Sequence, residues 1–148
     1  MQDTFALERF VEAQSAIYPR VVEELSAGRK RSHWMWFIFP QIAGLGSSAM
    51  AQRFAIGSKR ETQAFLAHDL LGPRLIECTR LVMAASEKRI GDILGYPDDM
   101  KFRSSMTLFD AVSNPGIFAD AINTFFLDGR DPATLEILSR RAGQGDTS

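Results

Sequence analysis

Apolar side chains recur every three or four residues along most of this chain, a spacing that places them on one face of an α-helix. Helix-start signals punctuate the pattern. Ser58 and Glu61 form a capping box, and Asp131 precedes Pro132 as an N-cap before a first-turn proline. A chain of 148 residues suffices for one domain. The pattern predicts a mainly α fold, a single compact domain of about seven short helices over residues 1–142, with a flexible polar tail at 143–148.

Residues 33–39 are the segment whose local structure the spacing leaves open. They form an apolar run, from His33 to Phe39, that fits either an alternating strand or a buried helix. A strand needs a second strand to pair with, and the rest of the sequence offers no candidate. We therefore predict a helix here.

Charge and cysteine content exclude several classes of protein. The net charge of −1 argues against nucleic acid as a partner. It is unevenly spread, with −3 over residues 1–28, +6 over 29–89 and −4 over 90–148. The single cysteine, Cys78, fits a reducing compartment, so we expect a cytoplasmic protein without a targeting segment or membrane span. Two distant histidines and no cysteine pair predict no metal site, and no motif implies a cofactor.

The most basic run of the chain is followed at once by a histidine and two tryptophans, which makes it a candidate anion site. Arginine offers a planar fork for phosphate, and tryptophan offers a face on which a nucleotide base can stack. His33 is a candidate catalytic residue because histidine exchanges protons near neutral pH. A solvated basic helix end is the alternative. The candidate ligand-binding residues here are Arg29, Lys30, Arg31, Trp34 and Trp36.

A second candidate anion site lies on a helix predicted from about Met100 to Val112 and capped by Asp98 and Asp99. Its apolar face would carry phenylalanine and methionine, with Lys101 and Ser105 at the margin near the helix N-terminus, where anions are favoured. The alternative is a snorkelling lysine and a serine bonded to its own helix. The candidate ligand-binding residues are Lys101, Ser104 and Ser105, while Arg103, Thr107 and Asp110 are expected on the opposite face.

Gly44 and Gly46 precede a serine, Ser47 or Ser48, that can cap a helix. Such a loop can present backbone amides to a ligand. However, the third glycine of the dinucleotide-binding fingerprint is missing, and no strand–helix–strand unit surrounds the pair. We therefore predict a tight turn followed by an N-cap.

The chain resembles a bacterial, uncharacterised family known as domain of unknown function 1810. The resemblance covers nearly the whole chain, and its most specific part runs from His33 to Gln41. Some members are labelled calpastatin-like, but a calpain inhibitor of that kind is a long disordered chain, unlike the compact helical chain predicted here. The family implies no established activity. The matching segments are residues 10–14, 28–41, 44–47, 71–75, 99–101, 104–109, 131 and 134–135.

A shorter part of the chain is similar to the NAD- and ADP-ribose-associated superfamily, whose small helical members cleave N-glycosidic bonds. This similarity rests on residues 71–77 and 92–99, and it transfers no catalytic residue. It implies a nucleotide-like ligand.

Several functions are compatible with these residues. The leading hypothesis is a domain that binds a small phosphorylated, nucleotide-like ligand and cleaves an N-glycosidic bond, with Asp99 or Glu77 stabilising an oxocarbenium-like centre. The alternative is a non-enzymatic interaction module that docks an acidic partner. In a third interpretation, a buried polar network fixes helix packing. The ligand-binding hypothesis would be favoured by a concave pocket that joins His33, Trp36, Lys101 and Ser105. The buried polar network would consist of His33, Lys101, Ser104 and Ser105.

Overall fold

The computed structural model describes residues 3–114 and 116–143, and these residues are mainly helical. The predicted fold class is confirmed, but the described residues form ten helices. Three of them are single turns of four or five residues, too short to show an apolar period. Of the tail expected at residues 143–148, Gly143 ends the last helix and the rest lies outside the described residues. The helices are α1 (Glu8–Ser15), α2 (Tyr18–Ser26), α3 (Met35–Ile38), α4 (Ala49–Arg53), α5 (Lys59–Ala67), α6 (Leu71–Ala84), α7 (Ile90–Leu94), α8 (Asp98–Asp110), α9 (Ile117–Phe125) and α10 (Pro132–Gly143).

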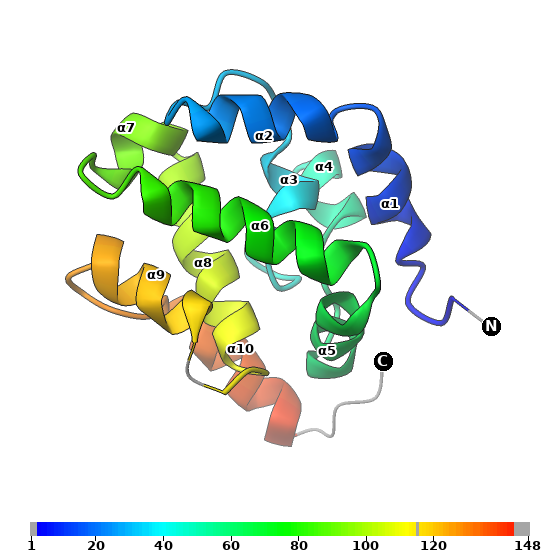
Figure 1. Ribbon diagram of the computed structural model, residues 1–148. Coiled ribbons are helices and arrows are strands. Elements are labelled where there is room, and N and C mark those ends of the chain that lie inside the picture. Colours follow the sequence, from blue (N-terminus) through cyan, green and yellow to red (C-terminus); the bar gives the residue numbers. More distant parts are fainter. Residues whose placement is uncertain (1–2, 115, 144–148) are drawn as a thin grey trace.

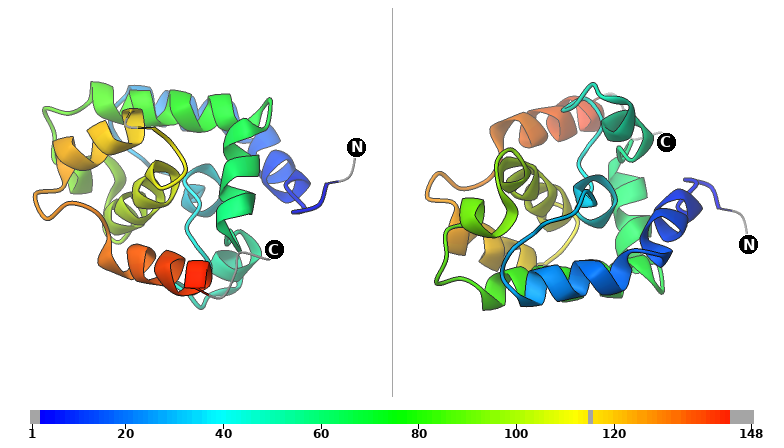
Figure 2. Two further views of the ribbon diagram at one scale, coloured as in Figure 1. Left: turned by 90° about the horizontal axis from the view of Figure 1, so that it is seen from below. Right: turned by 90° about the horizontal axis from the view of Figure 1, so that it is seen from above.

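Helix α8 lies in the middle of the molecule beside α3, and the other helices surround this pair (Figure 2). Helices α2 and α6 cover one side, and α9 and α10 cover another (Figure 1). Buried aromatic rings join the layers. The ring of Phe102 on α8 meets Phe39 edge-on at 5.0 Å between centroids. Because α10 also packs on α8, the face opposite the apolar arc is covered as well: Thr107 is buried, and its Oγ1 accepts the Asp131 N–H at 3.0 Å.

The segment at residues 33–39 contains the single helical turn α3, which confirms the prediction of a helix over a strand. The turn ends at Ile38, and Pro40 follows it. The β-pairing that the described residues show is one isolated bridge between Ile42 and Ile56. Most of this apolar segment is buried, so its composition reflects the core position of the turn.

Several helix starts follow the predicted caps. Ser58 Oγ accepts the Glu61 N–H at 3.0 Å, and Ser48 Oγ accepts the Ala51 N–H at 3.1 Å after the tight turn at Gly44. Helix α8 begins two residues earlier than expected, with Pro97 in the N-cap position. Asp98 therefore lies inside the first helical turn, where its carboxylate is free to pair with other elements. Within the described part of the chain, no helix has the length and apolar character needed to cross a membrane.

Candidate functional site

Residues 29–34, which we call the basic loop, leave the end of α2 and pass beside α7 (Figure 1). Gly28 has a φ of +72°, a left-handed conformation that glycine adopts easily, and it turns the chain after α2. The Arg29 N–H then donates to the Glu24 carbonyl at 3.0 Å, and the Lys30 N–H donates to the Ile93 carbonyl at 2.7 Å. The backbone of the loop is thus fixed to both helices.

The side chain of Glu24 organises the rest of the basic loop. Only 7% of this residue is exposed, and its carboxylate accepts four hydrogen bonds. Oε1 accepts the backbone N–H of Arg31 at 2.8 Å, the backbone N–H of Ser32 at 2.9 Å and the indole N–H of Trp34 at 2.9 Å. Oε2 accepts the hydroxyl of Ser32 at 2.6 Å. The loop is therefore wrapped around a buried acid.

The hydrogen bonds decide the ionisation of Glu24. Burial alone raises the pKa of this carboxyl, because the charged form loses water. The bonds from the Ser32 hydroxyl, the two backbone amides and the Trp34 indole favour the charged form more strongly, and they lower the pKa to about 2. Glu24 therefore carries its negative charge throughout the physiological pH range.

A second acid, Asp98, joins the basic loop to the central helix α8. Its Oδ2 lies 2.8 Å from Lys30 Nζ, and its Oδ1 lies 3.6 Å from Lys101 Nζ. The Lys30 side chain is only 8% exposed, and its ammonium also donates to the Ser32 carbonyl. Two of the predicted ligand-binding lysines thus share one carboxylate, and Lys30 is committed to the fold.

The two tryptophans accompany these lysines. Trp34 is fully buried, and Lys30 Nζ lies 5.0 Å from its ring centroid. Trp36 is partly buried, and Lys101 Nζ lies 4.9 Å from its ring centroid. These cation–π contacts and the burial of Trp34 leave that ring no face on which a base could stack.

The arginines of the basic loop remain at the surface. Arg29 and Arg31 are exposed, and with Arg20 of α2 they line an open hollow of about 400 Å³, which we call the arginine hollow. Glu23, Glu24 and Ser32 complete its polar lining. None of the three guanidinium groups has a hydrogen-bond or ion-pair partner among the described residues. The guanidinium groups of this hollow are therefore available to bind a ligand.

The predicted catalytic residues do not converge on one point. Glu77 is exposed on α6 and accepts a hydrogen bond from the Tyr18 hydroxyl. Asp99 lies at the start of α8, where its Oδ2 would be 3.4 Å from a Cβ atom placed on Gly91 of α7, and its Oδ1 accepts the Met100 N–H at 2.8 Å. His33 is exposed. Across the described residues, no three His, Cys, Asp or Glu side chains gather as a metal site would require.

The two serines of α8 have different surroundings. Ser104 donates to Asp131 Oδ2 at 2.8 Å, and Asp131 also caps α10. Ser105 is fully buried, and its hydroxyl has no hydrogen-bond partner in the part of the chain that the structure describes. Among the described residues, no hydrogen bond links these serines to His33 or Lys101, so the four-residue polar network is not formed.

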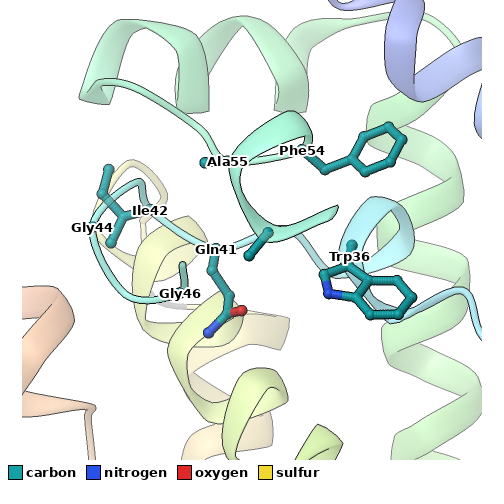
Figure 3. A pocket seen from close by; sticks show the side chains of 8 residues that line it. Trp36, Gln41, Ile42, Gly44, Gly46, Phe54 and Ala55 are labelled. Carbon is teal, nitrogen blue, oxygen red and sulfur yellow. The ribbon is translucent and has the colours of Figure 1, made fainter. Parts of the chain in front are cut away.

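A small hollow lies beside Trp36, at the turn that contains Gly44 and Gly46 (Figure 3). Its volume is about 10 Å³, which is room for roughly one water molecule. Its lining includes Trp36 and Gln41 but not His33, Lys101 or Ser105. This hollow is therefore not the concave pocket, joining those four side chains, that would favour the ligand-binding hypothesis.

Two residues of the site were not predicted from the sequence: Glu24, which holds the basic loop, and Arg20, which lines the arginine hollow. The pairing of Asp98 with Lys30 was not predicted either. A signal for Glu24 exists, because it follows Val21 by three residues and so lies on the apolar face of α2. An acid on an apolar face, just before three consecutive cations, indicates a buried partner for that loop. Arg20 gives no comparable signal, since its role depends on how the loop folds back.

The fold and these contacts define a class: a compact helical protein whose basic loop is held by a buried carboxylate and presents arginines to an open hollow. The comparisons with known proteins then identify the family. The model of the family described as Protein of unknown function (DUF1810) matches residues 4–138, and the chain belongs to this family. The structure is similar to the crystal structure of the conserved hypothetical protein Rv1873 from Mycobacterium tuberculosis, with a TM-score of 0.90. The two sequences are 51% identical, over 93% of this chain and 99% of that one. No match was found among curated proteins.

Proposed function

We propose that this protein binds a small phosphorylated, nucleotide-like ligand, with the phosphate in the arginine hollow. The observation that carries the proposal is that Arg20, Arg29 and Arg31 all line this hollow, and their guanidinium groups have no partners among the described residues. Guanidinium groups match phosphate oxygens in paired hydrogen bonds, and such charge-assisted bonds are about twice as strong as neutral ones.

The conformation of the basic loop is fixed before an anion binds. Glu24 accepts the backbone amides of residues 31 and 32, so the loop conformation does not depend on the ligand. A preformed site avoids the entropy cost of ordering a loop during binding. The hollow also has the size typical of small-molecule sites, which occupy roughly 300–1,000 Å³. This capture of one small anion is compatible with a net charge of −1, because the positive charge is local.

Cleavage of an N-glycosidic bond is the reaction we propose for such a ligand, and Asp99 is the better placed of the two candidate carboxylates. It lies against Gly91, which lines a second hollow beside Arg29. Glu77 of α6 instead accepts a hydrogen bond from Tyr18 of α2, and it does not line either hollow. A carboxylate at the ring carbon stabilises the positive charge that develops as the base leaves and water takes its place.

Isothermal titration calorimetry with inorganic phosphate, AMP, ADP-ribose and NAD tests the proposal. We expect Arg29→Ala and Arg31→Ala to weaken binding about tenfold each, since a charge-assisted bond contributes roughly 1.5–3 kcal/mol. Arg80→Ala is the matched control, because Arg80 is an exposed arginine on α6. An absence of heat and of thermal shift across the four ligands would refute binding. Release of free base that persists in Asp99→Asn would refute the role of that carboxylate.

A non-enzymatic interaction module is the second candidate. It is favoured by the finding that Lys30, Trp34 and Ser104, all polar residues of the family motif, are bonded within the fold. In that case the arginines would dock an acidic protein segment. A polyglutamate peptide that binds in an Arg31-dependent manner, together with no binding of the four small ligands, would favour this function over the first.

A further inference from the structure

A second open hollow adjoins the arginine hollow along α7. It has a volume of about 510 Å³, and Arg29 lines both hollows. The exposed guanidinium of Arg29 therefore stands between two spaces, each with a further cation at its edge. We call this second space the α7 hollow; its lining residues are Arg29, Lys30, Lys88, Gly91, Asp92, Ile93 and Gly95.

Lys88 is the cation that the α7 hollow can offer to a ligand. Its ammonium donates to the Gly28 carbonyl at 3.1 Å, which fixes its place and leaves two of its three donors for other partners. Lys30 also lines the hollow, but it is already paired with Asp98. Gly91 and Gly95 contribute no side chains, so a ligand can approach the backbone of α7 closely.

An exposed aromatic ring follows the α7 hollow in the sequence. Tyr96 comes directly after Gly95, and 85% of it is exposed to solvent. A tyrosine ring left in water is available to a ligand, since it combines a large apolar face with a polar hydroxyl. Trp34 is buried and Trp36 is covered by Lys101, so Tyr96 can take the stacking role that the sequence suggested for the tryptophans.

We infer that the ligand site extends from the arginine hollow across Arg29 into the α7 hollow and accepts a nucleoside diphosphate. One phosphoryl group lies between Arg20, Arg29 and Arg31, and the second lies between Arg29 and Lys88. The base stacks on Tyr96. This inference rests on the proposed function, and it adds the number of phosphoryl groups and the residue that recognises the base.

Calorimetry with inorganic phosphate, pyrophosphate and ADP separates these contacts. We expect the wild-type protein to bind pyrophosphate at least tenfold more tightly than phosphate. Lys88→Gln should remove that difference and leave phosphate binding within about twofold of wild type, while Lys88→Arg retains it. Tyr96→Ala should weaken the binding of ADP about tenfold, which is typical of one lost stacking contact, and should leave the affinity for pyrophosphate unchanged. Tyr96→Phe should bind ADP like the wild type, and Arg80→Ala is the control.

The failures of the two proposals differ. If phosphate and pyrophosphate bind equally, or if Lys88→Gln leaves the preference intact, the site does not extend along α7. Phosphate binding that depends on Arg31 would still support the proposed function. If ADP binding is insensitive to Tyr96→Ala, the assignment of the base contact is overturned. If none of the three ligands binds, both proposals are refuted. Unchanged melting curves of the Lys88 and Tyr96 variants show that each change is local.

Discussion

Replacing Glu24 by glutamine tests whether the charge of one buried carboxylate holds the basic loop in place. Glutamine has nearly the same shape, and its carbonyl oxygen can still accept from Arg31, Ser32 and Trp34. The substitution therefore removes the negative charge and keeps most of the hydrogen-bond geometry. Glu24→Ala would instead leave the Trp34 indole N–H buried without a partner, and it serves as the harsher comparison.

The size of the effect follows from the pKa of Glu24. An ordinary glutamate has a pKa of 4.5, and in the folded protein the value is about 2. At 1.36 kcal/mol for each pKa unit, this difference corresponds to roughly 3 kcal/mol of folding free energy. Because the pKa is lower in the folded state, this stabilisation is fully present above pH 4.5 and is lost as the pH falls toward 2. We expect Glu24→Gln to lower the free energy of unfolding by roughly 3 kcal/mol at pH 7.

Urea unfolding followed by circular dichroism at pH 7, 5, 4 and 3 measures the effect without relying on tryptophan fluorescence. The difference between the wild type and Glu24→Gln should be constant from pH 7 to pH 5. It should fall to about half by pH 3, because protonation of Glu24 in the unfolded chain is then nearly complete. A difference that stays constant down to pH 3 would contradict the argument, since it would arise from packing and not from charge.

Three further predictions concern neighbouring groups. Ser105→Ala should leave stability unchanged or raise it by about 1 kcal/mol, because it removes a buried hydroxyl without a partner; a loss of more than 1 kcal/mol in urea unfolding would reveal a hidden partner such as a buried water. Lys30→Met should destabilise the protein by about 3 kcal/mol, because Lys30 is the buried partner of Asp98. Lys101→Met should destabilise it by less than about 1 kcal/mol, because Lys101 Nζ lies 3.6 Å from Asp98 Oδ1 and the Lys101 side chain is more exposed. The reverse order in thermal unfolding would contradict this assignment. Burial raises the pKa of the Cys78 thiol to about 12, although Tyr18 opposes the shift, so the native protein should not react with DTNB at pH 8 until urea unfolds it.

Local signals in the sequence were enough to predict the helix caps and most of the helices. The Ser58 and Asp131 caps depend on side chains that reach only three residues along the chain, so no knowledge of the fold was needed. The single turns α3, α4 and α7 are shorter than the window in which an apolar period can be recognised. Their positions are set by the helices packed against them.

The candidate site was predicted only in part, because its charges are assigned by tertiary packing. Whether a lysine binds a ligand or a buried acid depends on which helix it meets. Lys30 pairs with Asp98, which lies 68 positions further along the chain, and this ion pair joins α8 to the basic loop. No spacing rule contains that information. The same packing places Glu77 next to Tyr18 and Asp99 near Gly91, although both acids were candidates for the same catalytic role.

The three consecutive cations of the basic loop are sorted by the direction of their side chains. Lys30, in the middle, points inward to Asp98 and Trp34, while Arg29 and Arg31 on either side are exposed. Neighbouring residues of an extended chain point to opposite sides, so fixing Lys30 inside also directs both arginines outward. Glu24 stabilises the same arrangement, because it accepts a hydrogen bond from the Arg31 backbone N–H and leaves the Arg31 side chain exposed. Asp98 therefore neutralises Lys30, Glu24 accepts the backbone amides, and the charge that remains exposed on the loop is carried by the arginines, whose side chains are well suited to bind phosphate.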